Sequence, residues 1–367
     1  MSTGAQGRAA DRGTDRTGGD GLAGVPLATA PTTRKDFVSD QEVRWCPGCG
    51  DYTILSALQS VLPRLGIRRE NTVVISGIGC SSRLPYYVNS YGMHSVHGRA
   101  PTLATGLAMT REDLAVFVVT GDGDALSIGA NHLVHALRRN VNLTILLFNN
   151  RIYGLTKGQY SPTSPVGAVT KSSPSGTFDN PLNPMSLALG AEATFVARAL
   201  DADRDALEET IEAAARHRGA SFVEIYQNCV VFNDGAYEAL RGPDRTESII
   251  RLRAGEPIVF GHDGHLGVVA GPDGGVRVAE VAEVGLENVL VHDPTIDDPS
   301  RAFALSRLTS TGAMAQAPMG VFRDVDRPVY DDLVRDHVRR AQETLGPDLG
   351  SDAALAALIA GTDTWQT

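Results

Sequence analysis

Two short polar clusters, each directly after an apolar run, constrain the fold of this chain more than any other feature. Residues 116–120 are apolar apart from a final threonine and lead into Gly-Asp-Gly-Asp at 121–124. Residues 143–148 form a second run, which leads into Asn-Asn-Arg-Ile-Tyr-Gly at 149–154. Between them, the apolar spacing over 127–139 predicts a helix. We therefore expect one β-α-β unit of a parallel sheet, with both polar clusters at the carboxyl ends of its strands, where α/β sheets bind ligands.

The side chains of these clusters suit a hard cation and a phosphate group. Asp122 offers a carboxylate and Asn150 an amide oxygen, and Mg²⁺ prefers oxygen ligands while retaining water and phosphate oxygens. Glycine beside a helix N-terminus lets backbone N–H groups approach a diphosphate closely. The alternative is an ordinary pair of turns in any sheet of this class.

The arrangement resembles the thiamine diphosphate motif of thiamine-dependent enzymes. In those enzymes the aspartate, the second asparagine and a carbonyl two residues later hold Mg²⁺ against the diphosphate. The resemblance assigns these roles to Asp122, Asn150 and the carbonyl of Ile152.

Composition limits the remaining classes of function. The 367 residues are 42% hydrophobic and carry a net charge of −10, which is typical of a globular protein and argues against nucleic acid or an anionic membrane as partner. No apolar run has transmembrane length and no secretory signal pattern is seen, so we expect a cytoplasmic protein. Residues 1–33 have almost no large apolar side chain, which predicts a disordered tail.

The four cysteines are the second chemical feature. Cys46 and Cys49 flank a Pro-Gly turn before a predicted helix at 52–62, whose N-terminus favours thiolate. A dithiol redox pair, half of a zinc site and half of an iron–sulfur site all remain open on this motif alone. Cys80 and Cys229 follow predicted strands at 72–76 and 222–227, which places them at the same sheet edge as Asp122. A lone cysteine in such a place is often only a small core residue.

Two further segments complete the candidate site. His97 precedes Gly98 and a predicted helix at 101–111; it is either a capping or core histidine or a contact to an anionic cofactor. After Ile152 a loop rich in Ser, Thr, Pro and Gly continues to about residue 184, and a loop of this length is usually functional or mobile.

We interpret the rest of the chain as structural support for this site. Helices are predicted from residue 182 to 189 and from 203 to 217, and no chemical motif stands out after residue 240. Residues 241–367 are interpreted as a C-terminal extension on the main domain or on a partner subunit, with short strands over 257–278 and a helix at 330–341.

Taken together in this order, the motifs resemble the β subunit of 2-oxoacid:ferredoxin oxidoreductases. The resemblance covers residues 35–240, with a looser match to about 335. It implies an α/β fold with a mostly parallel, doubly wound sheet of the thiamine-diphosphate-binding PP type over 34–240. Lys157 and the Gln-Tyr-Ser-Pro-Thr that begins at 159 are most similar to the 2-oxoglutarate branch.

This resemblance implies thiamine diphosphate, Mg²⁺ and one [4Fe–4S] cluster as cofactors. The cluster would use all four cysteines, Cys46, Cys49, Cys80 and Cys229, although a structural zinc ion would accept the same set. The implied cofactor contacts are Ile78, Gly79, Cys80, Ser81, His97, Gly123, Asp124, Gly154 and Leu155. We take Arg83 and Lys157 as candidates to bind the substrate carboxylates, with solvated surface cations as the alternative.

The implied reaction is the coenzyme A-dependent oxidative decarboxylation of 2-oxoglutarate to succinyl-CoA and CO₂, or its reverse, with electrons passing through the cluster to ferredoxin. The family supplies the glutamate that activates the cofactor's aminopyrimidine ring from another domain. Only one thiamine-type sheet is found here, so we expect activity only in a heteromer with an α subunit.

Three other functions compete with this interpretation. The substrate could be pyruvate or a wider range of 2-oxoacids. The chain could be a non-oxidative thiamine-dependent decarboxylase with a structural zinc ion, releasing an aldehyde. It could also be a non-catalytic iron–sulfur subunit that only relays electrons, which the presence of Asp122 and Asn150 disfavours.

Overall fold

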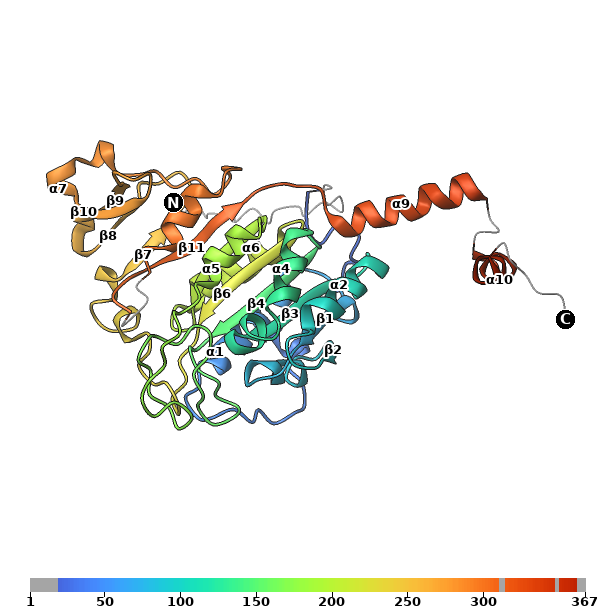
Figure 1. Ribbon diagram of the computed structural model, residues 1–367, viewed down its shortest axis with the longest axis horizontal. Helices are drawn as coiled ribbons and strands as arrows, with labels where there is room; N and C mark the ends of the chain where they lie inside the picture. Colours follow the sequence, from blue (N-terminus) through green and yellow to red (C-terminus); the bar gives the residue numbers. More distant parts are fainter. Residues whose placement is uncertain (1–18, 310–313, 347–349, 362–367) are drawn as a thin grey trace, which may run out of the picture.

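The computed structural model describes residues 19–309, 314–346 and 350–361. Its centre is one eight-stranded sheet with the strand order β2-β1-β3-β4-β6-β5-β11-β7 (Figure 1). The strands are β1 Thr72–Ser76, β2 Tyr91–His94, β3 Ala115–Gly121, β4 Leu143–Asn149, β5 Phe195–Leu200, β6 Ala220–Tyr226, β7 Ile249–Leu252 and β11 Ala317–Asp324. All neighbouring strands pair in parallel except β11 with β5, so the predicted mostly parallel sheet is confirmed.

Helices cover both faces of this sheet because its central strands are apolar on both sides. In β1, Val74 packs in one buried cluster with α1 (Asp51–Arg64) and α6 (Arg204–Arg216). Its neighbours Val73 and Ile75 belong to the opposite cluster, as the alternation of side chains along a strand requires. That second cluster contains residues of α2 Ala100–Thr110, α4 Ala130–Arg138 and α5 Pro184–Gly190. The doubly wound arrangement is therefore confirmed.

The helix after β3 differs from the prediction in a way that matters for the site. The chain enters α3 (Asp122–Leu126) immediately after the strand, breaks at Ser127, and continues as α4. Gly129 lies in the break, against the backbone of Gly98. A Cβ atom added to Gly98 would lie only 2.6 Å from the backbone nitrogen of Gly129. The close approach of these two glycines lies in the break between the helices, and the short helix α3 has its own N-terminus at Asp122.

The C-terminal extension contributes more to the fold than its sequence predicts. Strands β7 and β11 extend the main sheet, while β8 Val259–Phe260, β9 Leu266–Ala270 and β10 Val276–Glu280 form a separate antiparallel sheet in the region where short strands are predicted. The extension also contains α7 Val281–Val284, α8 Ser300–Ser306, α9 Tyr330–Leu345 and α10 Asp352–Ala360. Helix α9 starts beside α2 and runs away from the sheet (Figure 1). Contact of the extension with a partner subunit stays a prediction.

The predicted disordered tail is too long at its C-terminal end. Residues 1–18 lie outside the described residues, but Leu22 and Val25 are buried in the cluster that also contains α1 and α6. Backbone bridges join Asp20 to His217 and Leu27 to Ile67. Two apolar side chains and these bridges are enough to hold the segment against a preformed surface, which composition alone does not reveal.

In the part of the chain that is described, no helix has both the length and the apolar character needed to span a membrane.

Candidate active site at the carboxyl edge of the sheet

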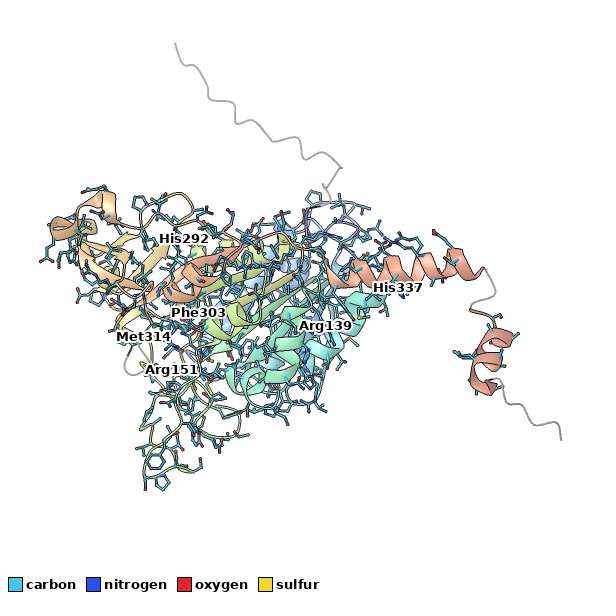
Figure 2. The ribbon with its side chains drawn as sticks, turned by 45° about the horizontal axis from the view of Figure 1, so that its top comes forward. Arg139, Arg151, His292, Phe303, Met314 and His337 are labelled. Carbon is cyan, nitrogen blue, oxygen red and sulfur yellow. The ribbon has the colours of Figure 1, made fainter. Side chains whose placement is uncertain are left out.

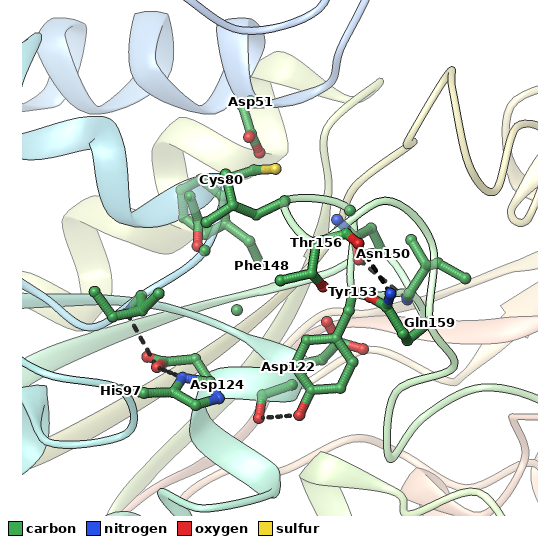
Figure 3. A pocket seen from close by; sticks show the side chains of 18 residues that line it. Asp51, Cys80, His97, Asp122, Asp124, Phe148, Asn150, Tyr153, Thr156 and Gln159 are labelled. Carbon is green, nitrogen blue, oxygen red and sulfur yellow. Dashed lines mark hydrogen bonds and ion pairs between the residues drawn. The ribbon is translucent and has the colours of Figure 1, made fainter. Parts of the chain in front are cut away.

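The parallel strands bring the predicted site residues to one edge. The segments after β1, β3, β4 and β6 carry Cys80, Asp122, Asn150 and Cys229 respectively. A cavity of about 490 Å³ opens at this edge (Figure 3). The predicted residues in its wall are Ile78, Gly79, Cys80, Ser81, His97, Asp122, Gly123, Asp124, Asn150, Ile152, Gly154 and Leu155. The tertiary structure therefore unites the two polar clusters, the glycine segment after β1 and His97 in one site.

Asp122 is the first residue of α3 and is buried, with 2% of its surface exposed. Its Oδ2 atom accepts hydrogen bonds from the hydroxyls of Ser161 (2.5 Å) and Thr163 (2.6 Å). Burial raises the pKa of this carboxyl to about 6, and the two hydroxyls act against that rise. Hydrogen bonds from the backbone N–H groups of Gly123 and Asp122 also act against the rise.

The two asparagines of the turn after β4 have different roles. Asn149 is buried and faces away from the cavity: its amide nitrogen donates to Glu224 (2.7 Å), and its side-chain oxygen accepts from the backbone N–H of Arg151 (3.1 Å). Asn150 lines the cavity. Arg151 has a left-handed backbone, with φ of 58°, which turns the chain sharply so that both Asn150 and Ile152 border the same cavity.

The residues around this cavity fit Mg²⁺ and a diphosphate. Asp122 and Asn150 provide hard oxygen donors in one wall. The hydroxyl of Ser81 is buried in the same wall and has no hydrogen-bond partner among the described protein atoms, and such a group is expected to meet a polar ligand. Gly123 is required here because a Cβ would lie 2.2 Å from the Tyr153 ring. The oxygen donors and the space beside Gly123 therefore suit the predicted thiamine diphosphate and Mg²⁺.

The side chain of Asp124 is held by protein groups. Its Oδ1 accepts from the backbone N–H groups of Ile78 (3.0 Å) and Gly98 (2.7 Å) and contacts Nδ1 of His97 (2.6 Å), while Oδ2 accepts from Thr120 (2.7 Å). Because an ionised carboxylate only accepts hydrogen bonds, Nδ1 of His97 carries the proton in this contact. Asp124 thus joins three segments of the site and orients His97 (Figure 3). The contact of Asp124 with the diphosphate stays a prediction. Because the carboxylate of Asp124 is already hydrogen-bonded to protein groups, its backbone N–H would make that contact.

Replacing Asp124 by alanine is expected to weaken thiamine diphosphate binding by about tenfold or more, since hydrogen bonds to charged groups contribute about 1.5–3 kcal/mol each. Asp124→Asn keeps an acceptor for His97 and the backbone donors, so we expect a smaller loss. Calorimetric titration with thiamine diphosphate and Mg²⁺ measures both. Equal affinity of Asp124→Ala and the unsubstituted protein would contradict the proposed orienting role.

The four cysteines gather on one side of the cavity. A Cβ atom on Gly154 would lie 3.5 Å from the sulfur of Cys80 and 3.6 Å from that of Cys229, so these two sulfurs flank the turn after β4. The nearby Cys229 and Cys80 contribute to the raised pKa of Cys49, and Cys46 contributes to that of Cys80. All four are free thiols. The structure therefore brings together residues that lie up to 183 positions apart in the chain, 46 to 229.

Burial makes Cys49 and Cys80 poor thiolates when no metal is bound. It raises the pKa of Cys49 and, to about 12, that of Cys80, and the nearby Asp51 carboxylate adds to both rises. The predicted thiolate at the helix N-terminus is therefore wrong for Cys49 in the bare protein, because burial outweighs the helix dipole. A bound metal would reverse this by displacing the thiol protons.

Across the described residues, no three or more His, Cys, Asp or Glu side chains are placed to hold a single metal ion. The kind of metal centre that the four cysteines would hold stays a prediction.

The two predicted substrate-binding cations do not line the cavity. Arg83 donates from Nε to the hydroxyl of Tyr87 (3.1 Å). Lys157 is exposed, with a left-handed φ of 81°, on the tight turn between Tyr153 and Gln159 at the cavity wall. Their contact with substrate carboxylates stays a prediction.

Several residues of the wall are missed by sequence reasoning: Asp51, Phe148, Tyr153, Thr156 and Gln159. Tyr153 donates from its hydroxyl to the carbonyl of Gly123 (2.9 Å). Burial raises the pKa of the Asp51 carboxyl to about 7, and a hydrogen bond with Cys49 acts against that rise. Each of these residues adjoins a motif already recognised, so proximity in sequence to the Cys-x-x-Cys and Asn-Asn segments is the signal that identifies them.

Comparison with known proteins gives the family. Residues 77–225 match the family described as "Thiamine pyrophosphate enzyme, C-terminal TPP binding domain". The chain is 60% identical over 343 residues to 2-oxoglutarate oxidoreductase subunit KorB of Mycobacterium tuberculosis, which covers 94% of this chain and 91% of that one. It is 44% identical over 215 residues to 2-oxoacid:ferredoxin oxidoreductase 1, subunit beta, of Aeropyrum pernix, with 59% of this chain and 67% of that one covered.

A solved structure agrees with this assignment. The 2-oxoglutarate:ferredoxin oxidoreductase of Magnetococcus marinus, with 2-oxoglutarate, coenzyme A and succinyl-CoA bound, superposes with a TM-score of 0.69 at 34% identity. The alignment covers 90% of this chain and 96% of the other. The match with the thiamine family spans β3, β4 and the cavity between them. The chain belongs to the β subunits of the 2-oxoglutarate:ferredoxin oxidoreductase family.

Proposed function

We propose that this chain is the subunit that binds thiamine diphosphate in an enzyme that oxidises 2-oxoglutarate to succinyl-CoA and CO₂ and passes the electrons to ferredoxin. The observation that carries the proposal is a single cavity whose wall contains Asp122, Asn150 and the unpartnered hydroxyl of Ser81, together with Cys80. A site for an organic cofactor and a site for an electron acceptor therefore share one wall, as electron transfer between them requires.

When bound, thiamine diphosphate supplies an electron sink for decarboxylation of the 2-oxoacid. The chain's own residues would hold and orient it. Asp122, Asn150 and the carbonyl of Ile152 are the ligands that we assign to Mg²⁺. Gly123 and Gly154 leave space for the diphosphate beside the N-terminus of α3, and His97 is oriented by Asp124.

We assign one [4Fe–4S] cluster to Cys46, Cys49, Cys80 and Cys229. The sulfurs of Cys80 and Cys229 lie beside Gly154, which also lines the cofactor cavity. This proximity supports transfer of single electrons from the cofactor to the cluster and then to ferredoxin. Four free thiols also suit a reducing compartment such as the cytoplasm.

The assignment of 2-oxoglutarate rests on relatives and on the loop after β4. The similar proteins of M. tuberculosis and M. marinus are named for 2-oxoglutarate. Lys157 lies between Thr156 and Gln159, which both line the cavity. We assign to this exposed side chain the cation that binds the second carboxylate of the substrate.

An α subunit completes the proposed site. Among the described residues of the cavity wall there is no glutamate, so the residue that activates the aminopyrimidine ring has to come from a partner. At the same wall, Ile78 and Leu155 are each 44% exposed, and exposed apolar side chains at a site suit cover by another chain.

The test uses the complex formed by co-expressing this chain with its α subunit. Coenzyme A-dependent reduction of a low-potential dye is measured with 2-oxoglutarate, pyruvate and a branched-chain 2-oxoacid. We expect the highest kcat/KM with 2-oxoglutarate and no turnover by the isolated chain. A higher kcat/KM with pyruvate would show that the preferred substrate is pyruvate and not 2-oxoglutarate. Aldehyde formation without any electron acceptor would favour the non-oxidative decarboxylase and overturn the proposal.

A further inference from the structure

The carboxylate of Asp122 is tied to the long loop after β4 through one of its two oxygens. The hydroxyls of Ser161 and Thr163 both donate to Oδ2, at 2.5 and 2.6 Å, and all three residues are at least 96% buried. Two buried donors on one carboxylate oxygen hold the side chain of Asp122 in one orientation.

The same loop is connected to the Asn-Asn turn. The Nε atom of Arg151 donates to the carbonyl of Thr163 (3.1 Å), and the hydroxyl of Ser164 donates to the carbonyl of Arg151 (2.6 Å). The hydroxyl of Thr163 also lies 2.9 Å from the side-chain oxygen of Asn149. Figure 2 shows Arg151 where the sheet meets the loops at its carboxyl edge. One buried network therefore contacts both segments that supply the metal ligands.

We propose that Ser161 and Thr163 are positioning residues for the metal site. They direct Asp122 toward the cation and link cation binding to the order of the loop at 150–183, which contains no helix or strand. The inference rests on the proposed function, since it takes Asp122 as a ligand of Mg²⁺. It adds that the hydroxyls of Ser161 and Thr163, which are not themselves ligands of the cation, set the affinity of the site for the cation.

The first test measures the Mg²⁺ requirement of cofactor binding in the α/β complex. At fixed thiamine diphosphate, the Mg²⁺ concentration for half-maximal binding is determined for Thr163→Val, which keeps the shape of the side chain, and for Ser161→Ala. Loss of such supporting hydrogen bonds typically reduces metal affinity 10–100-fold. We expect about a tenfold rise in this concentration for each single variant, and a larger rise for the double variant.

Two further variants separate positioning from general damage to the loop. Thr163→Ser restores a hydroxyl and should return the Mg²⁺ requirement close to that of the unsubstituted protein. Thr170→Val removes a hydroxyl on the same loop that bonds only within residues 170–173 and should change nothing. An equal effect of Thr170→Val and Thr163→Val would overturn the inference.

The second test reports on the loop itself. Lys171 is exposed on it, so trypsin cleavage there measures how well the loop is held. Thiamine diphosphate with Mg²⁺ should slow cleavage of the unsubstituted complex, and much less so that of the Ser161→Ala, Thr163→Val double variant. If the unsubstituted complex shows no Mg²⁺-dependent binding, the proposed function fails. If it binds normally and the variants match it in both tests, only the further inference fails.

Discussion

Replacing Asp122 by asparagine is expected to abolish cofactor retention and to lower turnover by at least about 10³-fold, because a catalytic metal site contributes several kcal/mol. Asparagine keeps the shape of the side chain and an oxygen that accepts from Ser161 and Thr163, but it removes the negative charge that the cation needs. The loss should therefore come from the metal site and not from misfolding.

Stability provides an independent check on this variant. Burial raises the pKa of Asp122 to about 6, above the usual value of 3.8, so ionisation of this group in the folded protein opposes folding at neutral pH. Without cofactor, Asp122→Asn should therefore melt at the same temperature as the unsubstituted protein or higher. With Mg²⁺ and thiamine diphosphate added, only the unsubstituted protein should gain stability, as expected when a ligand binds the folded state.

Asp263→Asn is the matched control. Asp263 is exposed and has a left-handed backbone, with φ of 55°, a conformation that asparagine adopts readily. It should retain full binding and turnover. An Asp122→Asn complex that still binds Mg²⁺ and thiamine diphosphate with normal affinity would remove Asp122 from the ligand set that we propose.

Replacing Cys80 by alanine is expected to reduce ferredoxin reduction to background. Of the four proposed cluster ligands, Cys80 lines the cofactor cavity, so its loss would remove a ligand at the proposed point of electron transfer. Since the four cysteines are the only ones in the chain, no neighbouring thiol can substitute for it.

This prediction is measured on protein purified without oxygen. Iron, acid-labile sulfide and zinc are quantified, and the EPR spectrum is recorded after reduction with dithionite. The unsubstituted chain should contain iron and sulfide in the proportions of one four-iron cluster, with a reduced-cluster signal that Cys80→Ala lacks. Zinc without sulfide in the unsubstituted chain would show instead that the cysteines hold a structural ion.

Much of the site was predictable because its residues follow directly after apolar strands. The positions of Asp122 after β3 and of Asn150 after β4 follow from strand composition and from the geometry of a parallel sheet. Cys80 and Cys229 could be placed at the same edge by the same argument. These predictions depend on local sequence and on a rule that holds for every sheet of this class.

Other parts of the fold were missed because their sequences lack a local signal. Strand β5 contains Arg198, which is 1% exposed and pairs with the buried Glu224 of β6 at 2.7 Å. A charged residue in a strand does not predict burial unless its partner is known. Strands β7 and β11 likewise become recognisable only through their pairing with each other and with β5.

The amino-acid sequence by itself determined which groups are available to this protein: a carboxylate, amides, glycines and four thiols, each at the end of a strand or the start of a helix. Only the tertiary structure decided how those groups are used. In the folded chain the carboxylate of Asp124 contacts His97 and accepts from two backbone N–H groups. Ser161 and Thr163, which are 39 and 41 residues away from Asp122 in the sequence, donate hydrogen bonds to it. The physical reason is that strand and helix signals are short-range, whereas the partner of a buried polar group is fixed by the folded chain around it.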